Sequence, residues 1–205
     1  HSGLGGLDTN YTGKGVVIGI VDQGIDYNHP DFQNPDGSTR VIRYWDHTVN
    51  DSNHPNYYTL YEKGIVWDSS AINNGTCTSL EVSSAHGSTA SGMAASNGSA
   101  NGTNKGFAPE ADLIVVESDF SQDVYNWKLS IADACDYIFK VADSLNKPAV
   151  INLSLGDYYG THDATDPAAE LSNDLLDEKE GRIVVSAAGN SGDFGPYHVG
   201  VDVTS

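Results

Sequence analysis

The chain has 205 residues, which is the size of one ordinary domain with a full core or of a large piece of a bigger one. Its 28 acidic residues against 10 basic ones give a formal net charge of -18 at pH 7, so it would repel the phosphates of nucleic acids and of anionic membranes. No apolar run approaches the roughly 20 residues that span a bilayer, and we expect no signal peptide, no nucleic-acid partner and no membrane partner.

The first predicted element is a strand that ends at Asp22. Residues 16–21 read VVIGIV, an apolar run bounded by Gly15, and such a run is typical of a strand buried on both faces of a parallel sheet. Asp22 then lies at the carboxyl end of that strand, which is the edge where ligands bind in open α/β sheets. The alternative is that Asp22 only caps the following turn.

The next segment, residues 33–84, lacks a long periodic pattern. It follows the sequence HPDF, in which Pro30 marks a turn. Short runs of residues that favour strands, 41–45 and 65–67, are separated by Asn, Asp, Ser and Gly. We interpret residues 33–84 as an inserted surface excursion.

A helix of small residues is predicted to begin at His86. Residues 86–96 read HGSTASGMAAS, and small side chains let a helix approach neighbouring backbone closely. A histidine of this kind, taken alone, is more often structural than catalytic. After a Gly-rich loop at 98–106, a second apolar strand is predicted over 112–116, and it leads into Ser118.

An amphipathic helix and a third strand follow. Apolar residues recur at spacings of three and four over residues 127–145, which predicts a helix packed on the sheet and ending before Pro148. Residues 150–155 form the third apolar run.

One more helix and strand complete the alternation. Asp166 is a predicted N-cap, Pro167 suits the first helical turn, and Gly181 ends the helix before a fourth strand over 182–187. Strands and helices that alternate at this spacing predict an α/β fold built from βαβ units with right-handed crossovers.

Three side chains are expected to meet at the carboxyl edge of this sheet. Asp22 follows the first strand, Asn190 follows the fourth in the sequence GNSG, and the His86 ring can project from the start of its helix. These side chains suit acyl transfer, because the acid orients the imidazole, the imidazole moves the proton and the amide NH₂ stabilises the oxyanion.

Four motifs carry a family resemblance. IGIVDQGID with HPDF, HGSTASGMAAS with GFAPEADL, VINLSLG, and VVSAAGNSG occur in that order, and together they resemble the subtilisin-like serine proteases, the subtilase family, over nearly the whole chain. The resemblance implies a three-layer α/β sandwich with a mainly parallel, doubly wound sheet. It also implies that residues 1–205 are part of a catalytic domain whose sheet is incomplete at its C-terminal side.

The resemblance also implies roles for single residues. Asp22 matches the triad aspartate, His86 the triad histidine that acts as general base and then acid, and Asn190 the oxyanion-hole asparagine. Asp31 matches a position that binds calcium in many relatives.

The substrate implied by the resemblance is a polypeptide bound as an added β-strand. Ser154, Leu155 and Gly156 match one of the two strands that clamp it, and Ser118 lies in the stretch that matches the other. A protease of this kind is expected to be secreted or attached to the cell envelope.

The sequence departs from the family pattern at the nucleophile. The motif Gly-Thr-Ser-Met/Ala-Ala-x-Pro does not occur in the 205 residues, and Ser205 does not match it. We therefore expect the nucleophilic serine to lie beyond this chain and the isolated chain to be inactive. Gln23 stands where relatives usually have Ser or Thr, and Thr89 where a second histidine is common.

Two other functions stay open at this point. The parent protein could be a pseudoprotease or a peptide-binding scaffold with the same fold. A phosphoryl-transferring hydrolase could use Asp22 as nucleophile or metal ligand, but position 24 is Gly where that class needs a second carboxylate.

Two cysteines and five histidines are assigned no role in chemistry. We expect Cys77 and Cys135 to be unpaired, because their neighbourhoods differ. The histidines lack metal-ligand spacing and are expected at the surface; they are His29, His47, His54, His162 and His198.

Overall fold

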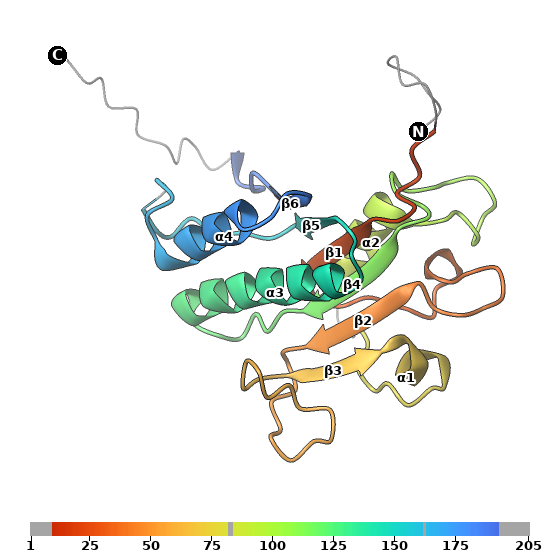
Figure 1. Cartoon of the computed structure of the whole chain (residues 1–205), viewed down its shortest axis with the longest axis horizontal. Coiled ribbons are helices and arrows are strands. Elements are labelled where there is room, and N and C mark those ends of the chain that lie inside the picture. The colour runs from red at the N-terminus through yellow and green to blue at the C-terminus, as the bar shows by residue number, and fades with distance from the viewer. Residues whose placement is uncertain (1–9, 82–83, 162, 193–205) are drawn as a thin grey trace.

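The structure is a computed structural model that describes residues 10–81, 84–161 and 163–192. The described residues form a six-stranded sheet in the order β3-β2-β4-β1-β5-β6 (Figure 1). All neighbouring strands are parallel except β3, which runs antiparallel to β2. The strands are β1 (Val17–Asp22), β2 (Val41–Asp46), β3 (Ile65–Asp68), β4 (Asp112–Glu117), β5 (Ala149–Leu153) and β6 (Arg182–Ser186).

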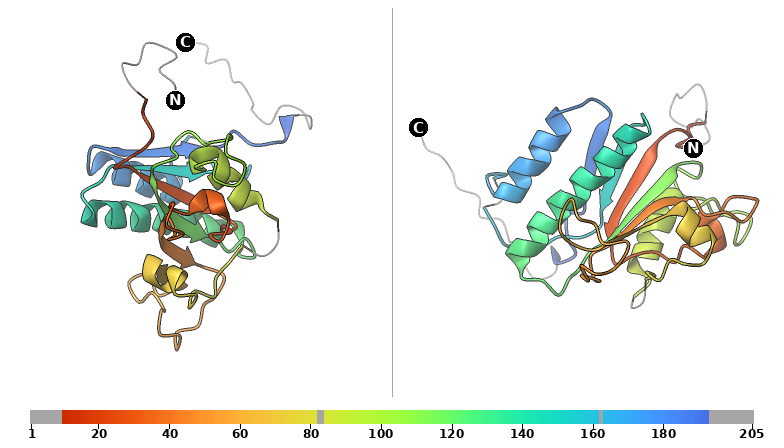
Figure 2. Two further views of the ribbon diagram at one scale, coloured as in Figure 1. Left: turned by 90° about the vertical axis from the view of Figure 1, so that its right-hand side faces the viewer. Right: turned by 60° about the horizontal axis from the view of Figure 1, so that its bottom comes forward.

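Helices cover both faces of this sheet. The described helices are α1 (Ser69–Asn73), α2 (His86–Ala95), α3 (Val124–Ser144) and α4 (Pro167–Asp177), with a 3-10 turn at Pro30–Phe32. The long helices α3 and α4 lie side by side on one face, and α2 lies on the other (Figure 2). The predicted three-layer, mainly parallel α/β fold is therefore confirmed. Among the described residues, no helix is both long enough and apolar enough to span a membrane.

Strand β1 is the centre of the sheet, between β4 and β5. All six of its residues are buried, as the apolar run predicted. Helix α3 packs directly on it at Gly19, where a Cβ atom would lie 2.7 Å from Cγ2 of Ile138. This close packing fixes the carboxyl end of β1, and with it Asp22, relative to the rest of the fold.

Side-chain caps begin the two helices on the α3 face. The Asp123 carboxylate accepts the N–H groups of Tyr125 and Asn126 at the start of α3. The predicted N-cap Asp166 accepts two N–H groups at the start of α4, whose first residue is Pro167. Each cap satisfies donors that have no partner within the helix.

Residues 33–84 differ from the surface excursion expected for them. They contribute β2 and β3 to the main sheet, and Tyr44 and Trp45 of β2 are fully buried. The Trp45 ring packs on the Tyr137 ring of α3, with centroids 4.8 Å apart. The sequence of β2, VIRYWD, hides this burial because polar residues interrupt its apolar positions.

One of the histidines expected at the surface is buried. The His47 ring is buried against the Trp45 ring, with centroids 4.1 Å apart, and burial lowers the pKa of His47 to about 3. His47 is therefore a neutral core side chain. His29 is exposed and His54 is half-buried, whereas His162 and His198 lie outside the described residues. Cys77 and Cys135 are both free, as predicted.

Candidate active site

Strand β1 delivers Asp22 to the carboxyl edge of the sheet. The carboxylate is buried, and its Oδ1 atom lies 2.8 Å from Nδ1 of His86 and accepts the Gln23 backbone N–H at 2.8 Å. The other oxygen, Oδ2, is buried and has no hydrogen-bond partner among the described residues. One oxygen thus holds the imidazole in a fixed orientation.

Helix α2 brings the imidazole to this carboxylate because its first turn lies directly on the loop after β1. A Cβ atom on Gly87 would lie 2.0 Å from the carbonyl oxygen of Gly24, so only glycine fits there. The Asp26 N–H donates to Oγ of Ser88 at 2.7 Å, which ties the same turn to the loop. Since Nδ1 of His86 faces Asp22, Nε2 is the ring nitrogen available for proton transfer to or from a substrate.

A cleft of about 550 Å³ lies over the Asp22–His86 pair. We call it the His86 cleft, and its walls come from the ends of β1, β4 and β5 and from the start of α2. Its lining residues are Asp22, Gln23, Ser84, Ala85, His86, Thr89, Phe120, Ser154, Leu155 and Gly156. Three of the four residues predicted to bind substrate therefore lie beside the acid and the imidazole.

The fourth, Ser118, lies at the same edge but faces the interior. Its hydroxyl accepts the Trp127 indole N–H at 3.0 Å, and its backbone N–H donates to the carbonyl oxygen of Asp22 at 2.7 Å. The residue that lines the cleft from this segment is Phe120, which lies in the stretch 118–120 that the family resemblance matches to the second substrate strand. A substrate-binding role for Ser118 stays a prediction.

Asn190 follows β6 at the edge where β1 and β5 also end. It is exposed and is not among the residues that line the His86 cleft. The preceding Gly189 has a φ of 93°, a left-handed conformation that favours glycine. An oxyanion role for Asn190 also stays a prediction.

Asp31, whose position the family resemblance links to calcium, contacts the loop that follows α2. Its Oδ1 atom accepts the Ala100 N–H at 2.8 Å, and its main-chain oxygen accepts the Asn97 N–H at 3.1 Å. Calcium takes six to eight oxygen ligands, and the described residues contain no cluster of three acidic, histidine or cysteine side chains that could hold a metal. The side chains around Asp31 do not form a calcium site by themselves, and calcium binding stays a prediction.

Two more strands, β4 and its other neighbour β2, also end in carboxylates at this edge of the sheet. Glu117 of β4 lies in register with Asp22 and with Asp46 of β2. Glu117 accepts the Tyr44 hydroxyl at 2.7 Å, and burial, together with the negative charges of Asp46 and Glu81, raises its pKa to about 7. The carboxyl edge of the sheet therefore holds a side chain, Glu117, that binds a proton near neutral pH.

This raised pKa predicts that stability falls as pH rises. The folded protein holds the Glu117 proton up to about pH 7, whereas the unfolded chain loses it near the ordinary value of 4.5. The stabilisation is complete below pH 4.5 and is lost between 4.5 and 7, a loss of about 3 kcal/mol in the free energy of unfolding. Glu117→Gln keeps an acceptor for Tyr44 and should remove this pH dependence in urea unfolding measured at pH 5 and pH 8. The exposed Glu180→Gln is the matched control, and an unchanged slope in Glu117→Gln would contradict the assignment.

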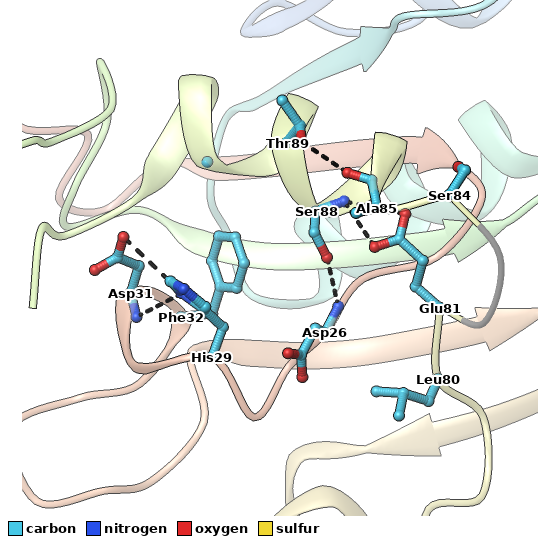
Figure 3. Close-up of a pocket in the computed structure, with 11 residues that line it drawn as sticks. Asp26, His29, Asp31, Phe32, Leu80, Glu81, Ser84, Ala85, Ser88 and Thr89 are labelled. Atoms are coloured by element: carbon cyan, nitrogen blue, oxygen red, sulfur yellow. Dashed lines mark hydrogen bonds and ion pairs between the residues drawn. The ribbon is translucent and has the colours of Figure 1, made fainter. Parts of the chain in front are cut away.

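A second pocket, of about 680 Å³, lies against the start of α2 (Figure 3). It shares Ser84, Ala85 and Thr89 with the His86 cleft. Its wall includes Glu81, whose side chain points to the first turn of α2 (Figure 3). Glu81 is not among the residues predicted from the sequence, although a carboxylate shortly before a helix start is a recognisable capping signal.

Comparison with known proteins shows which family the chain resembles over most of its length. The profile of the Subtilase family matches residues 13–203. The PII-type proteinase of Lacticaseibacillus paracasei is 29% identical over 198 residues, which cover 94% of this chain and 10% of that protein. The minor extracellular protease Vpr of Bacillus subtilis (strain 168) is 30% identical over 206 residues, which cover 97% of this chain and 20% of that protein.

Solved structures give the same result for the fold. The Clostridium perfringens CspB protease superposes with a TM-score of 0.75 at 24% identity, over 91% of this chain and 38% of that one. The S41 psychrophilic protease superposes with a TM-score of 0.57 at 26% identity, over 91% of this chain and 50% of that one. The chain thus spans a tenth to a fifth of the two curated relatives and half or less of these two solved chains.

Proposed function

The chain belongs to the subtilase family, and we propose that the protein containing it is a serine endopeptidase that hydrolyses peptide bonds by acyl transfer. The observation that carries the proposal is the 2.8 Å contact between Nδ1 of His86 and the buried carboxylate of Asp22. A histidine held in this way by a buried acid is the proton-transfer unit of the serine protease triad.

In this proposal each residue has a defined task. Asp22 fixes the imidazole tautomer and stabilises the imidazolium, while Nε2 of His86 takes the proton of the attacking hydroxyl and returns it to the leaving amine. Asn190 donates its side-chain N–H to the oxyanion. The polypeptide adds as a strand along Ser154, Leu155 and Gly156, which line the His86 cleft, and beside the segment of Ser118.

We place the nucleophilic serine outside the 205 residues, because the family's nucleophile motif does not occur in them. The test is labelling of the full-length protein with a fluorophosphonate, which reacts covalently with an activated serine. We expect one labelled serine beyond residue 205, lost in His86→Ala, and no labelling of the isolated chain. Absence of labelling in a folded full-length protein that still binds peptides would instead support a peptide-binding scaffold.

We propose that the protein is exported from the cytoplasm. The acidic surface suits an exported enzyme, and one relative carries the word extracellular in its name. Fractionation of the source cells with an antibody against this chain would test the proposal.

A further inference from the structure

The start of α2 is held from outside the helix. The Gly87 N–H donates to Oε1 of Glu81 at 2.7 Å, and the Ser88 N–H lies 3.3 Å from Oε1 and 3.2 Å from Oε2. Figure 3 shows the Glu81 side chain reaching this first turn from the preceding loop. The first N–H groups of a helix have no partner within it, so the carboxylate satisfies two donors that would otherwise be unpaired.

Glu81 takes over a task that the N-cap residue does not perform. The N-cap is Ala85, which makes no side-chain cap and adopts a left-handed conformation with φ 55° and ψ 15°. The His86 N–H has a separate partner, Oγ of Ser84 at 3.2 Å. Hydrogen bonds to an ionised acceptor are about twice as strong as those between neutral groups, so Glu81 is the main polar anchor of the turn.

The imidazole depends on this anchor for its position. The His86 side chain is 54% exposed, whereas that of its partner Asp22 is 1% exposed. Among the described residues the ring makes one hydrogen bond, to Asp22, so its position also depends on its backbone, which begins the turn that Glu81 holds.

We propose that Glu81 is a positioning residue for His86, acting through the first turn of α2. The proposal rests on the proposed protease function and adds to it a residue outside the triad. Glu81 lines the second pocket and not the His86 cleft, so it acts on the geometry of proton transfer and not on substrate contacts.

Steady-state kinetics of the full-length protein test this role. Because displacement of a reacting group by about 1 Å can cost 10²-fold, Glu81→Ala is expected to lower kcat about 10- to 100-fold with KM within about threefold of the wild type. Glu81→Gln keeps an acceptor oxygen for the Gly87 N–H and is expected to restore kcat to within about fivefold of the wild type. The control is Glu170→Ala, which removes an exposed carboxylate from the first turn of α4 and should leave both constants unchanged.

A spectroscopic readout separates positioning from general stability. The proton between His86 Nδ1 and Asp22 gives a low-field resonance in the proton NMR spectrum, which should weaken in Glu81→Ala and persist in Glu81→Gln. If Glu81→Ala does not fold, Glu81→Asp replaces it, because the shorter side chain cannot reach both N–H groups and should show the same loss.

Two results would overturn the proposal. One is a folded Glu81→Ala protein, or Glu81→Asp in its place, with wild-type kcat and an unchanged resonance. The other is a raised KM with unchanged kcat, which would make Glu81 a substrate contact. If the wild-type protein neither cleaves peptides nor reacts with the fluorophosphonate, the protease proposal fails but the positioning proposal does not. The low-field resonance of wild type and Glu81→Ala then tests the role of Glu81.

Discussion

Asp22→Asn is expected to lower kcat of the full-length protein by about 10⁴-fold, a magnitude known from other triad proteases and not deduced from these distances. An asparagine oxygen at the Oδ1 position can still accept from His86, but its negative charge is gone, so the imidazolium formed during proton transfer loses its stabilising partner. The asparagine NH₂ group then occupies the place of Oδ2, which is buried without a hydrogen-bond partner among the described residues. The unflipped amide therefore buries a donor without an acceptor. The flipped amide turns its NH₂ toward both the Gln23 N–H and His86, where it imposes the wrong tautomer, so neither orientation replaces the carboxylate.

The measurement is kcat and KM on a peptide substrate, with circular dichroism to verify the fold. The matched control is Asp26→Asn, which removes a carboxylate that lines the second pocket and accepts the nearby Asn28 N–H. It should change kcat less than about threefold. An Asp22→Asn enzyme that retains more than a tenth of wild-type kcat would contradict the role of Asp22 in proton transfer.

The sequence predicts most of this site because its elements obey local rules. The enrichment of β-branched residues before Asp22 favours a buried strand over a helix, and Asp166 followed by Pro167 marks a helix start. Because β1 and β5 are parallel neighbours, their ends meet, and the cleft between Asp22 and residues 154–156 follows from topology.

What the sequence did not predict depends on contacts between distant segments. The run at 41–45 favours a strand, but only its pairing with β4 places it in the main sheet and not in a surface excursion. In the same way, His47 looks like a surface residue until the Trp45 ring covers it. Glu81 accepts its hydrogen bonds from α2 while lying in an irregular loop, and no periodic sequence pattern predicts contacts of this kind. Within the predicted stretch 118–120 the sequence also does not show that Phe120, and not Ser118, lines the cleft from the loop after β4.

Gly87→Ala is the second change expected to have a large effect. The new Cβ would lie 2.0 Å from the carbonyl oxygen of Gly24 and 3.3 Å from Cβ of Asp22, and backbone oxygen cannot swing away as a flexible side chain would. The first turn of α2 must therefore move off the loop after β1. Since His86 precedes this glycine, its ring should withdraw from Asp22, and kcat should fall by about 100-fold or more.

Overpacking at this contact is also expected to cost about 3 kcal/mol of stability, seen as a lower Tm. The matched control is Gly92→Ala on the same helix, where a Cβ atom would meet no atom within 4 Å. Alanine suits a helix interior better than glycine by roughly 0.5 to 1 kcal/mol, so Gly92→Ala should raise Tm slightly and leave kcat unchanged. Two alanine substitutions five residues apart on one helix should thus shift stability in opposite directions. Equal effects of the two would show that the start of α2 does not lie against Gly24 as described.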